Sequence, residues 1–227
     1  MSAGPSRRKR IESDQYAVPM RIVLVGDSTV TDKDGWGPGF RARLAAGAEC
    51  VNCARGGRSS KSYRTEGLWD DAVKVEADWL FLQFGHNDQP GKGPERETDP
   101  ETSFAANMTA FVAEARAAGR RPVLITSLTR RTFDASGRLD DTLGPWVAAT
   151  RRVAAETGTP LIDLYRASTA LCVELGPEGC ERLSPPKPGP ALDRTHLNSE
   201  GALVFGNLVA DLVRAAIPEL RPWIDPE

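Results

Sequence analysis

The chain has 227 residues, of which 40% are hydrophobic and 26% charged, and its formal net charge is −2. This size and composition are typical of one globular domain with a sizeable core. The small net charge gives no reason to expect a nucleic acid or an anionic membrane as a partner. No stretch approaches the roughly 18 apolar residues that a membrane-spanning helix needs.

The N-terminal segment carries a basic cluster, Arg7–Arg10, which no apolar run follows. This pattern is typical of a solvated, disordered tail and not of a secretory signal. The sequence therefore predicts a disordered tail over residues 1–20, a single domain over residues 21–227 and a cytoplasmic location.

The four cysteines do not predict a metal site. Cys50 and Cys53 lie three apart in an expected strand, where their side chains point to opposite faces, so they suit neither a redox motif nor one shared ion. Cys172 and Cys180 are expected to be free thiols in the cytosol, although they could form a disulfide in a secreted chain. No second pair has zinc-ligand spacing.

The first expected element is a buried strand over Arg21–Val25, a short apolar run rich in β-branched side chains. Gly26 ends the strand, and Asp27, Ser28 and Thr29 follow in a turn. A serine directly beyond the carboxyl end of a buried strand lies where open α/β sheets place their active sites. Because Gly-Asp-Ser is also ordinary turn chemistry, Ser28 alone leaves the function open.

Short apolar runs then alternate with longer amphipathic stretches. Further strands are expected over Ala48–Cys53, Trp79–Gln83, Pro122–Thr126 and Pro160–Asp163. Helices are expected over about Trp36–Ala46, Glu101–Ala118, from beyond Asp141 to Glu156, over about Leu164–Leu175, and from beyond Asn198 to Ile217. This order predicts a parallel sheet covered on both faces, a three-layer α/β/α domain of the flavodoxin type. The glycine-rich loop at residues 35–39 lacks phosphate-loop and dinucleotide spacing, so no cofactor is expected.

Polar residues able to do chemistry are expected after strand ends, on one edge of the sheet. Asp193 lies three residues before His196, close enough to fix the imidazole tautomer and to stabilise its charge when it takes a serine proton. Asn87 can donate a hydrogen bond to a developing oxyanion, and Gly57 permits a close backbone approach. Asp193 could instead cap the last helix, which would leave His196 as a surface residue.

His86 is the other histidine of the chain and a competing base. It follows an expected strand directly, and Asp88 is its nearby acid. A histidine that packs against the loop and braces it explains the same pattern equally well.

Four segments resemble the conserved blocks of the SGNH (GDSL-like) hydrolases: Gly26–Thr29, Gly57, Gly85–Asp88 and Asp193–His196. Four segments are similar, more specifically, to the rhamnogalacturonan acetylesterase family: Gly26–Thr29, Ala54–Tyr63, Arg64–Gly67 and Phe84–Asp88. The similarity spans residues 21–213, which is nearly all of the predicted domain.

This resemblance implies a nucleophile at Ser28, a base at His196 and an orienting acid at Asp193. It also implies an oxyanion hole made by the Ser28 and Gly57 backbone N–H groups and the Asn87 amide. The enzyme it implies is a serine esterase that removes acetyl groups from carbohydrates, such as pectin-derived oligosaccharides, through an acyl-enzyme and without metal or cofactor. Its expected partner is a small-molecule or oligosaccharide ester, with no nucleic acid and no membrane. A lipase or thioesterase of the same superfamily and a non-catalytic sugar-binding module are the alternatives.

Several side chains are candidates for contact with the substrate. Trp36, Trp69 and Tyr63 could stack on a sugar ring, although core packing is the competing role for each tryptophan. Arg58 could contact hydroxyl groups or a uronate carboxylate, and His86 could also face the substrate.

Overall fold

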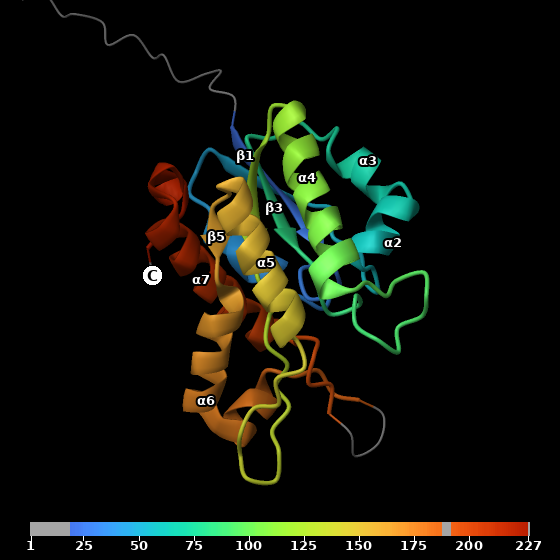
Figure 1. Ribbon diagram of the computed structural model, residues 1–227. Helices are drawn as coiled ribbons and strands as arrows, with labels where there is room; N and C mark the ends of the chain where they lie inside the picture. The colour runs from blue at the N-terminus through green and yellow to red at the C-terminus, as the bar shows by residue number, and fades with distance from the viewer. Residues whose placement is uncertain (1–18, 188–191, 227) are drawn as a thin grey trace, which may run out of the picture.

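The computed structural model describes residues 19–187 and 192–226, and within them five parallel strands form one sheet in the order β2-β1-β3-β4-β5 (Figure 1). The strands are β1 (Met20–Gly26), β2 (Ala48–Asn52), β3 (Trp79–Gln83), β4 (Arg121–Ile125) and β5 (Leu161–Ile162). The predicted parallel sheet is confirmed, and its order is that of flavodoxin-type domains. The first strand begins one residue earlier than predicted, and residues 1–18 of the predicted tail lie outside the described residues.

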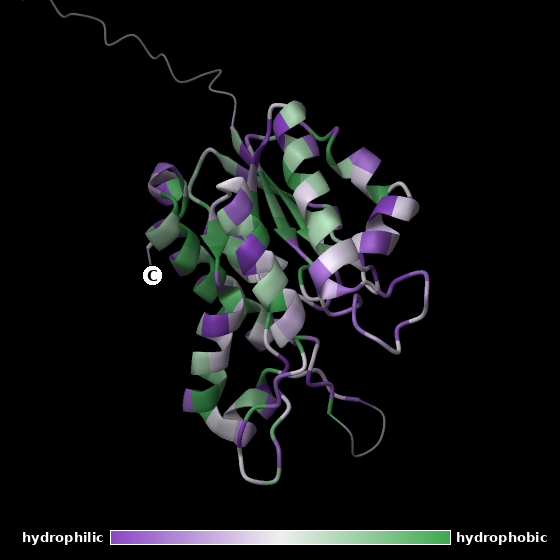
Figure 2. Cartoon of the chain, viewed as in Figure 1, coloured by the Kyte–Doolittle hydropathy of each residue, from purple (hydrophilic) through white to green (hydrophobic). Residues whose placement is uncertain are grey.

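Both faces of the sheet are buried, which explains why its strands are nearly continuous apolar runs. Because side chains alternate along a strand, Ile22 and Leu24 pack into one core while Val23 and Val25 pack into another. All four side chains are fully buried. Figure 2 shows these apolar strands enclosed between helices whose polar residues lie toward the outside.

Helices cover the two faces and complete the predicted three layers. The Ile22 and Leu24 face is covered by α1 (Gly37–Ala42), α6 (Leu164–Arg182), α7 (Ser199–Ala216) and the 3-10 helix η2 (Pro218–Trp223). The Val23 and Val25 face is covered by α2 (Ser60–Thr65), α3 (Leu68–Ala72), the π-helical turn η1 (Pro100–Phe104), α4 (Ala105–Ala117) and α5 (Gly144–Thr157).

Three helical features differ from the sequence-based expectation. α1 ends at Ala42, four residues before its predicted end. α6 continues past its predicted end through a kink at Gly176, where φ is 66° and ψ is −178°, because Pro177 starts a second helical segment. Helices α2 and α3 were not predicted, since six and five residues are too few to show a helical hydrophobic period.

The cysteines lie as the strand pattern predicts. Cys50 packs against the core that contains Ile22, and Cys53 packs against the core on the other face. All four cysteines are free thiols.

None of the helices in the described part of the chain is long and apolar enough to cross a membrane.

The strand order fixes where a site can form. From β1 the chain crosses to β2 on one side and then returns to β3 on the other, so the loops after β1 and β3 flank the point where the order reverses. Open α/β sheets bind ligands at this point. Asp193 and His196 reach the same edge differently from the expectation, because they lie in the loop between α6 and α7 and not directly after a strand.

Candidate active site

Ser28 lies in a tight turn directly after β1. Gly26 is required there because a Cβ atom would lie 2.6 Å from both the Gln83 carbonyl oxygen and a methyl carbon of Val30. The Ser28 carbonyl accepts hydrogen bonds from the Thr31 amide, at 3.3 Å, and from the Thr31 hydroxyl, at 2.7 Å. The turn therefore holds the serine with only 8% of its surface exposed.

The loop between α6 and α7 brings His196 against Ser28. Its Nε2 lies 2.9 Å from Ser28 Oγ, and its Nδ1 lies 2.8 Å from Asp193 Oδ2. The other oxygen of Asp193 accepts the amide hydrogens of Thr195 and His196, each at 3.0 Å. Helix α7 is capped by Asn198 instead, whose side chain accepts the Gly201 amide, so Asp193 is not the helix cap.

The charge of Asp193 selects the tautomer of His196. Burial raises the pKa of this carboxyl, but hydrogen bonds from His196 and Thr195 outweigh it and lower the pKa to about 2. The ionised carboxylate accepts a hydrogen bond from an N–H group at Nδ1, which keeps the ring hydrogen on that nitrogen. The lone pair of Nε2 then faces the Ser28 hydroxyl, which is the arrangement that proton removal from a serine requires.

The loop after β2 lies against the same serine. The Arg55 amide donates to the Gly26 carbonyl at 2.9 Å, and a Cβ atom at Gly56 would lie 3.7 Å from Ser28 Cβ. Gly57 follows with φ at +77°, a conformation that favours glycine. The predicted neighbours Ser28 and Gly57 therefore belong to two loops in contact.

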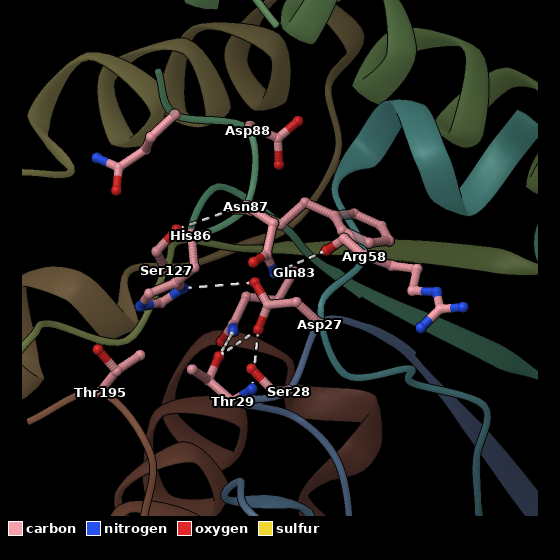
Figure 3. A network of polar contacts seen from close by, with 12 residues as sticks. Asp27, Ser28, Thr29, Arg58, Gln83, His86, Asn87, Asp88, Ser127 and Thr195 are labelled. Atoms are coloured by element: carbon pink, nitrogen blue, oxygen red, sulfur yellow. Dashed lines mark hydrogen bonds and ion pairs between the residues drawn. The ribbon is translucent and has the colours of Figure 1, made fainter. Parts of the chain in front are cut away.

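Asn87, in the loop after β3, is linked to the loop after β2. Its side-chain amide donates to the Arg58 carbonyl at 3.1 Å, as the dashed line in Figure 3 shows. Because a side-chain amide carries two N–H donors, one remains for a further acceptor. Only 9% of Asn87 is exposed.

His86 pairs with Asp27 and not with the expected acid. Its Nδ1 lies 3.4 Å from Asp27 Oδ2, and both side chains are buried beneath the turn that carries Ser28 (Figure 3). Burial raises the pKa of Asp27, yet His86 and the hydrogen bonds of Thr29 lower it overall. With 3% of its surface exposed, His86 does not face a substrate, and the bracing alternative describes its position.

A buried polar chain continues from this pair. The Thr29 hydroxyl donates to Asp27 Oδ1 at 2.7 Å, Gln83 Nε2 donates to Thr29 at 2.7 Å, and Trp36 Nε1 donates to Gln83 at 2.9 Å. Sequence analysis did not single out Asp27 or Gln83 as site residues. The available signal was a glutamine at the end of an otherwise apolar strand.

The three aromatic candidates for substrate contact lie in the core, which is the competing role named for the tryptophans. Trp36, Tyr63 and Trp69 are all buried, with at most 2% of their surface exposed. Their polar atoms bind the protein: the Tyr63 hydroxyl donates to the Cys53 carbonyl, and the Trp69 indole N–H donates to Glu114. Each is large enough that packing between helix and sheet accounts for it.

Arg58 is engaged within its own loop, whereas the neighbouring Arg55 is exposed. Arg58 forms an ion pair with Glu66 at 2.9 Å and donates to the Gly56 carbonyl, also at 2.9 Å. Arg55 borders a cavity of about 390 Å³ whose lining includes Gly56, the residue that packs against Ser28. Six of the eight residues that line this cavity are polar or charged: Thr31, Asp32, Lys33, Asp34, Asn52 and Arg55.

Asp88 anchors the loop that follows Asn87. It accepts hydrogen bonds from the amide and hydroxyl of Ser60 and from the hydroxyl of Thr98. Burial raises its pKa to about 7, against the lowering effect of these hydrogen bonds.

This raised pKa predicts a loss of stability with rising pH. An unfolded aspartate releases its proton near pH ~4, so between pH ~4 and ~7 the folded chain binds more protons than the unfolded chain. The stability that Asp88 contributes below this window is therefore lost as pH rises through it, by up to about 4 kcal/mol. We expect Asp88→Asn to flatten this part of a plot of unfolding free energy against pH. Denaturant titrations between pH 5 and 8 measure it, and parallel profiles for the two proteins would contradict the prediction.

The chain is similar to several known proteins. The chain is 36% identical over 210 residues to the rhamnogalacturonan acetylesterase RhgT of Bacillus subtilis, covering 85% of this chain and 89% of that protein. It is 28% identical to the rhamnogalacturonan acetylesterase of Emericella nidulans, covering 84% of this chain and 83% of that protein.

The crystal structure of the Bacillus subtilis protein YxiM superposes with a TM-score of 0.75 at 28% identity, over 89% of this chain. The chain spans 58% of the length of that protein. Residues 24–204 match the family model of the GDSL-like lipases and acylhydrolases, a span that contains Ser28, Asn87, Asp193 and His196. The chain therefore belongs to the GDSL-like lipase/acylhydrolase family.

Proposed function

We propose that this protein is a serine esterase that removes O-acetyl groups from carbohydrates through an acyl-enzyme. The observation that carries the proposal is the continuous hydrogen-bonded chain from Ser28 Oγ through His196 to Asp193. A nucleophile, a base and an orienting acid at these distances are what acyl transfer to serine requires.

In the first half of the reaction, Ser28 Oγ attacks the acetyl carbon while His196 Nε2 takes the hydroxyl hydrogen. The bond between the acetyl carbon and the sugar oxygen then breaks, and His196 returns the proton to that oxygen. In the second half, a water molecule loses a proton to His196 and attacks the acetyl-serine. Acetate leaves, and Ser28 recovers its hydrogen.

The negative charge that develops on the acetyl oxygen needs donors already in position. The contact between the loops after β1 and β2 and the remaining N–H of Asn87 support this role for the Ser28 and Gly57 amides and the Asn87 side chain. No metal or cofactor takes part in these steps.

Alanine at Asn87 tests this assignment. We expect kcat to fall by about 10²–10³-fold with KM nearly unchanged, the usual loss of one oxyanion donor. Asn107→Ala is the matched control, because Asn107 donates to the Ser60 hydroxyl and does not contact Ser28 or His196. An equal loss of kcat in both variants would show that Asn87 acts only by holding its loop in place and not as an oxyanion donor.

Two observations support an acetylated carbohydrate as the substrate class. The cavity bordered by Gly56, the neighbour of Ser28, is lined mainly by polar and charged side chains, which suit hydroxyl groups better than a long acyl chain. Two relatives, 36% and 28% identical, are named as rhamnogalacturonan acetylesterases, so we infer pectin-derived oligosaccharides as the natural esters. A cytoplasmic location, which the four free cysteines support, belongs to the same proposal.

Chain-length preference separates this function from that of a lipase. Octanoate has six more methylenes than acetate, and a channel that buried them at ~0.8 kcal/mol each would favour octanoate by about 5 kcal/mol. We expect kcat/KM to be higher for p-nitrophenyl acetate than for p-nitrophenyl octanoate. We also expect release of acetate from acetylated rhamnogalacturonan oligosaccharides. Ser28→Ala controls for spontaneous hydrolysis. Faster turnover of octanoate would move the assignment to a lipase-type enzyme.

A further inference from the structure

A buried arginine lies under the loop that carries His196. Arg131 follows β4, and only 2% of its surface is exposed. Its backbone amide donates to the Arg194 carbonyl at 2.8 Å. Its guanidinium donates to Ser184 Oγ at 3.1 Å and to three backbone carbonyls of one turn, those of Asp193, Thr195 and His196.

The acceptors of this guanidinium are unusual for a buried cation. Among residues 19–187 and 192–226, no carboxylate forms an ion pair with Arg131. A buried charge is costly unless hydrogen bonds replace the water it loses. Here the carbonyls of the 193–196 turn supply most of those bonds, so the turn and the guanidinium depend on each other. The planar fork of an arginine also directs its N–H groups more rigidly than a lysine would.

The turn lies outside the regular elements of the fold, and Arg131 links its backbone to the loop after β4. Ser28 and Asn87 follow strands directly, and the sheet fixes their position. The 193–196 turn lies between α6 and α7, outside helix and strand. Its backbone is joined instead to Arg131, which the end of β4 places at the same edge of the sheet.

We propose that Arg131 is the positioning residue of the base: its guanidinium sets the 193–196 turn so that His196 Nε2 meets Ser28 Oγ. This inference rests on the proposed function, in which His196 takes the serine proton. Arg131 does not touch the reacting atoms. Its effect passes through the backbone of the 193–196 turn, whose carbonyls it binds.

The test compares Arg131→Met with Arg43→Met. Arg43 is also a buried arginine, but it binds Asp211 and the Asp225 carbonyl, near the C-terminal end of the chain. We expect Arg131→Met to lower kcat by about 10²-fold with KM unchanged, the scale of loss for a catalytic group misplaced by about 1 Å. Arg43→Met is expected to lower the melting temperature and to leave kcat unchanged. Arg131→Lys keeps the charge without the planar fork, so its kcat is expected to fall less than that of Arg131→Met. It replaces Arg131→Met in this test if the methionine variant does not fold.

Double variants show whether Arg131 acts through the base. In a His196→Ala background, adding Arg131→Met is expected to cost nothing further, because the group it positions is gone. In an Asn87→Ala background the two losses are expected to multiply. A folded Arg131→Met enzyme with wild-type kcat, or one whose loss persists unchanged without His196, would overturn the inference.

A measurement independent of turnover separates this inference from the proposed function. The measurement is a proton NMR spectrum that follows the hydrogen between His196 Nδ1 and Asp193 Oδ2, two atoms 2.8 Å apart. Its resonance is expected to shift or broaden in Arg131→Met and to stay unchanged in Arg43→Met. A wild-type protein inactive on every ester but showing this NMR difference would reject the esterase and keep the positioning role. An unchanged resonance in Arg131→Met would reject the positioning role.

Discussion

Ser28→Ala and His196→Ala are each expected to lower kcat on acetyl esters by on the order of 10⁵–10⁶-fold. The hydroxyl and the imidazole lie 2.9 Å apart and act in one step, so the double variant should be little slower than either single one. The measurement is kcat from steady-state turnover of p-nitrophenyl acetate, with circular dichroism to confirm the fold. Additive losses in the double variant would show that the two residues do not act as a unit.

His86→Ala is the matched control for this experiment, because it removes the other histidine of the chain. His86 contacts buried Asp27 and not the serine hydroxyl, so its loss should reach turnover only through the position of the turn and should be far smaller. If His86→Ala abolished turnover while His196→Ala retained it, the base would be His86 and the assignment of Asp193 would fall with it.

Asp193→Asn is expected to lower kcat by about 10⁴-fold, less than the loss of Ser28. The asparagine keeps the shape, but its neutral amide no longer holds the hydrogen on Nδ1 or stabilises the imidazolium. Because the pKa of Asp193 is about 2, the wild-type carboxylate stays ionised from pH 5 to 9. Its titration should therefore not shape the pH–rate profile in that range.

The measurement for Asp193→Asn is kcat across pH 5 to 9 beside the wild type. Asp163→Asn is a matched control, since Asp163 is also partly buried but pairs with Arg151 away from Ser28. A wild-type level of kcat in Asp193→Asn would show that the acid only shapes its turn.

The layers of the fold could be predicted because they depend on local pattern. A strand buried on both faces must be apolar throughout, and the runs at residues 21–25 and 79–83 show this directly. Helices α2 and α3 escaped prediction because tertiary packing of Tyr63 and Trp69, and not periodicity, holds such short segments.

The nucleophile, base and acid could be predicted from sequence because turn chemistry, spacing and family resemblance all indicated them. In the structure these three residues lie in contact. The surroundings of the candidate substrate-contact residues could not be predicted. Sequence shows that Trp36 and Arg58 are able to bind a sugar, but not that an indole N–H is held by Gln83 or that a guanidinium is paired with Glu66. Arg131 carries no sequence signal either, since arginine usually lies at the surface.

The hydrogen bond between Ser28 and His196 joins residues 168 positions apart. The helices that follow Ser28 and His196 along the chain also meet closely, because α7 packs against α1 so tightly that a Cβ atom at Gly39 would lie 2.2 Å from the Ala202 carbonyl oxygen. Contacts of such long range are slow to form, since a long loop must close before they stabilise the chain. The return of hydrolytic activity during refolding therefore reports a late step, in which the segments that contain Ser28 and His196 come together.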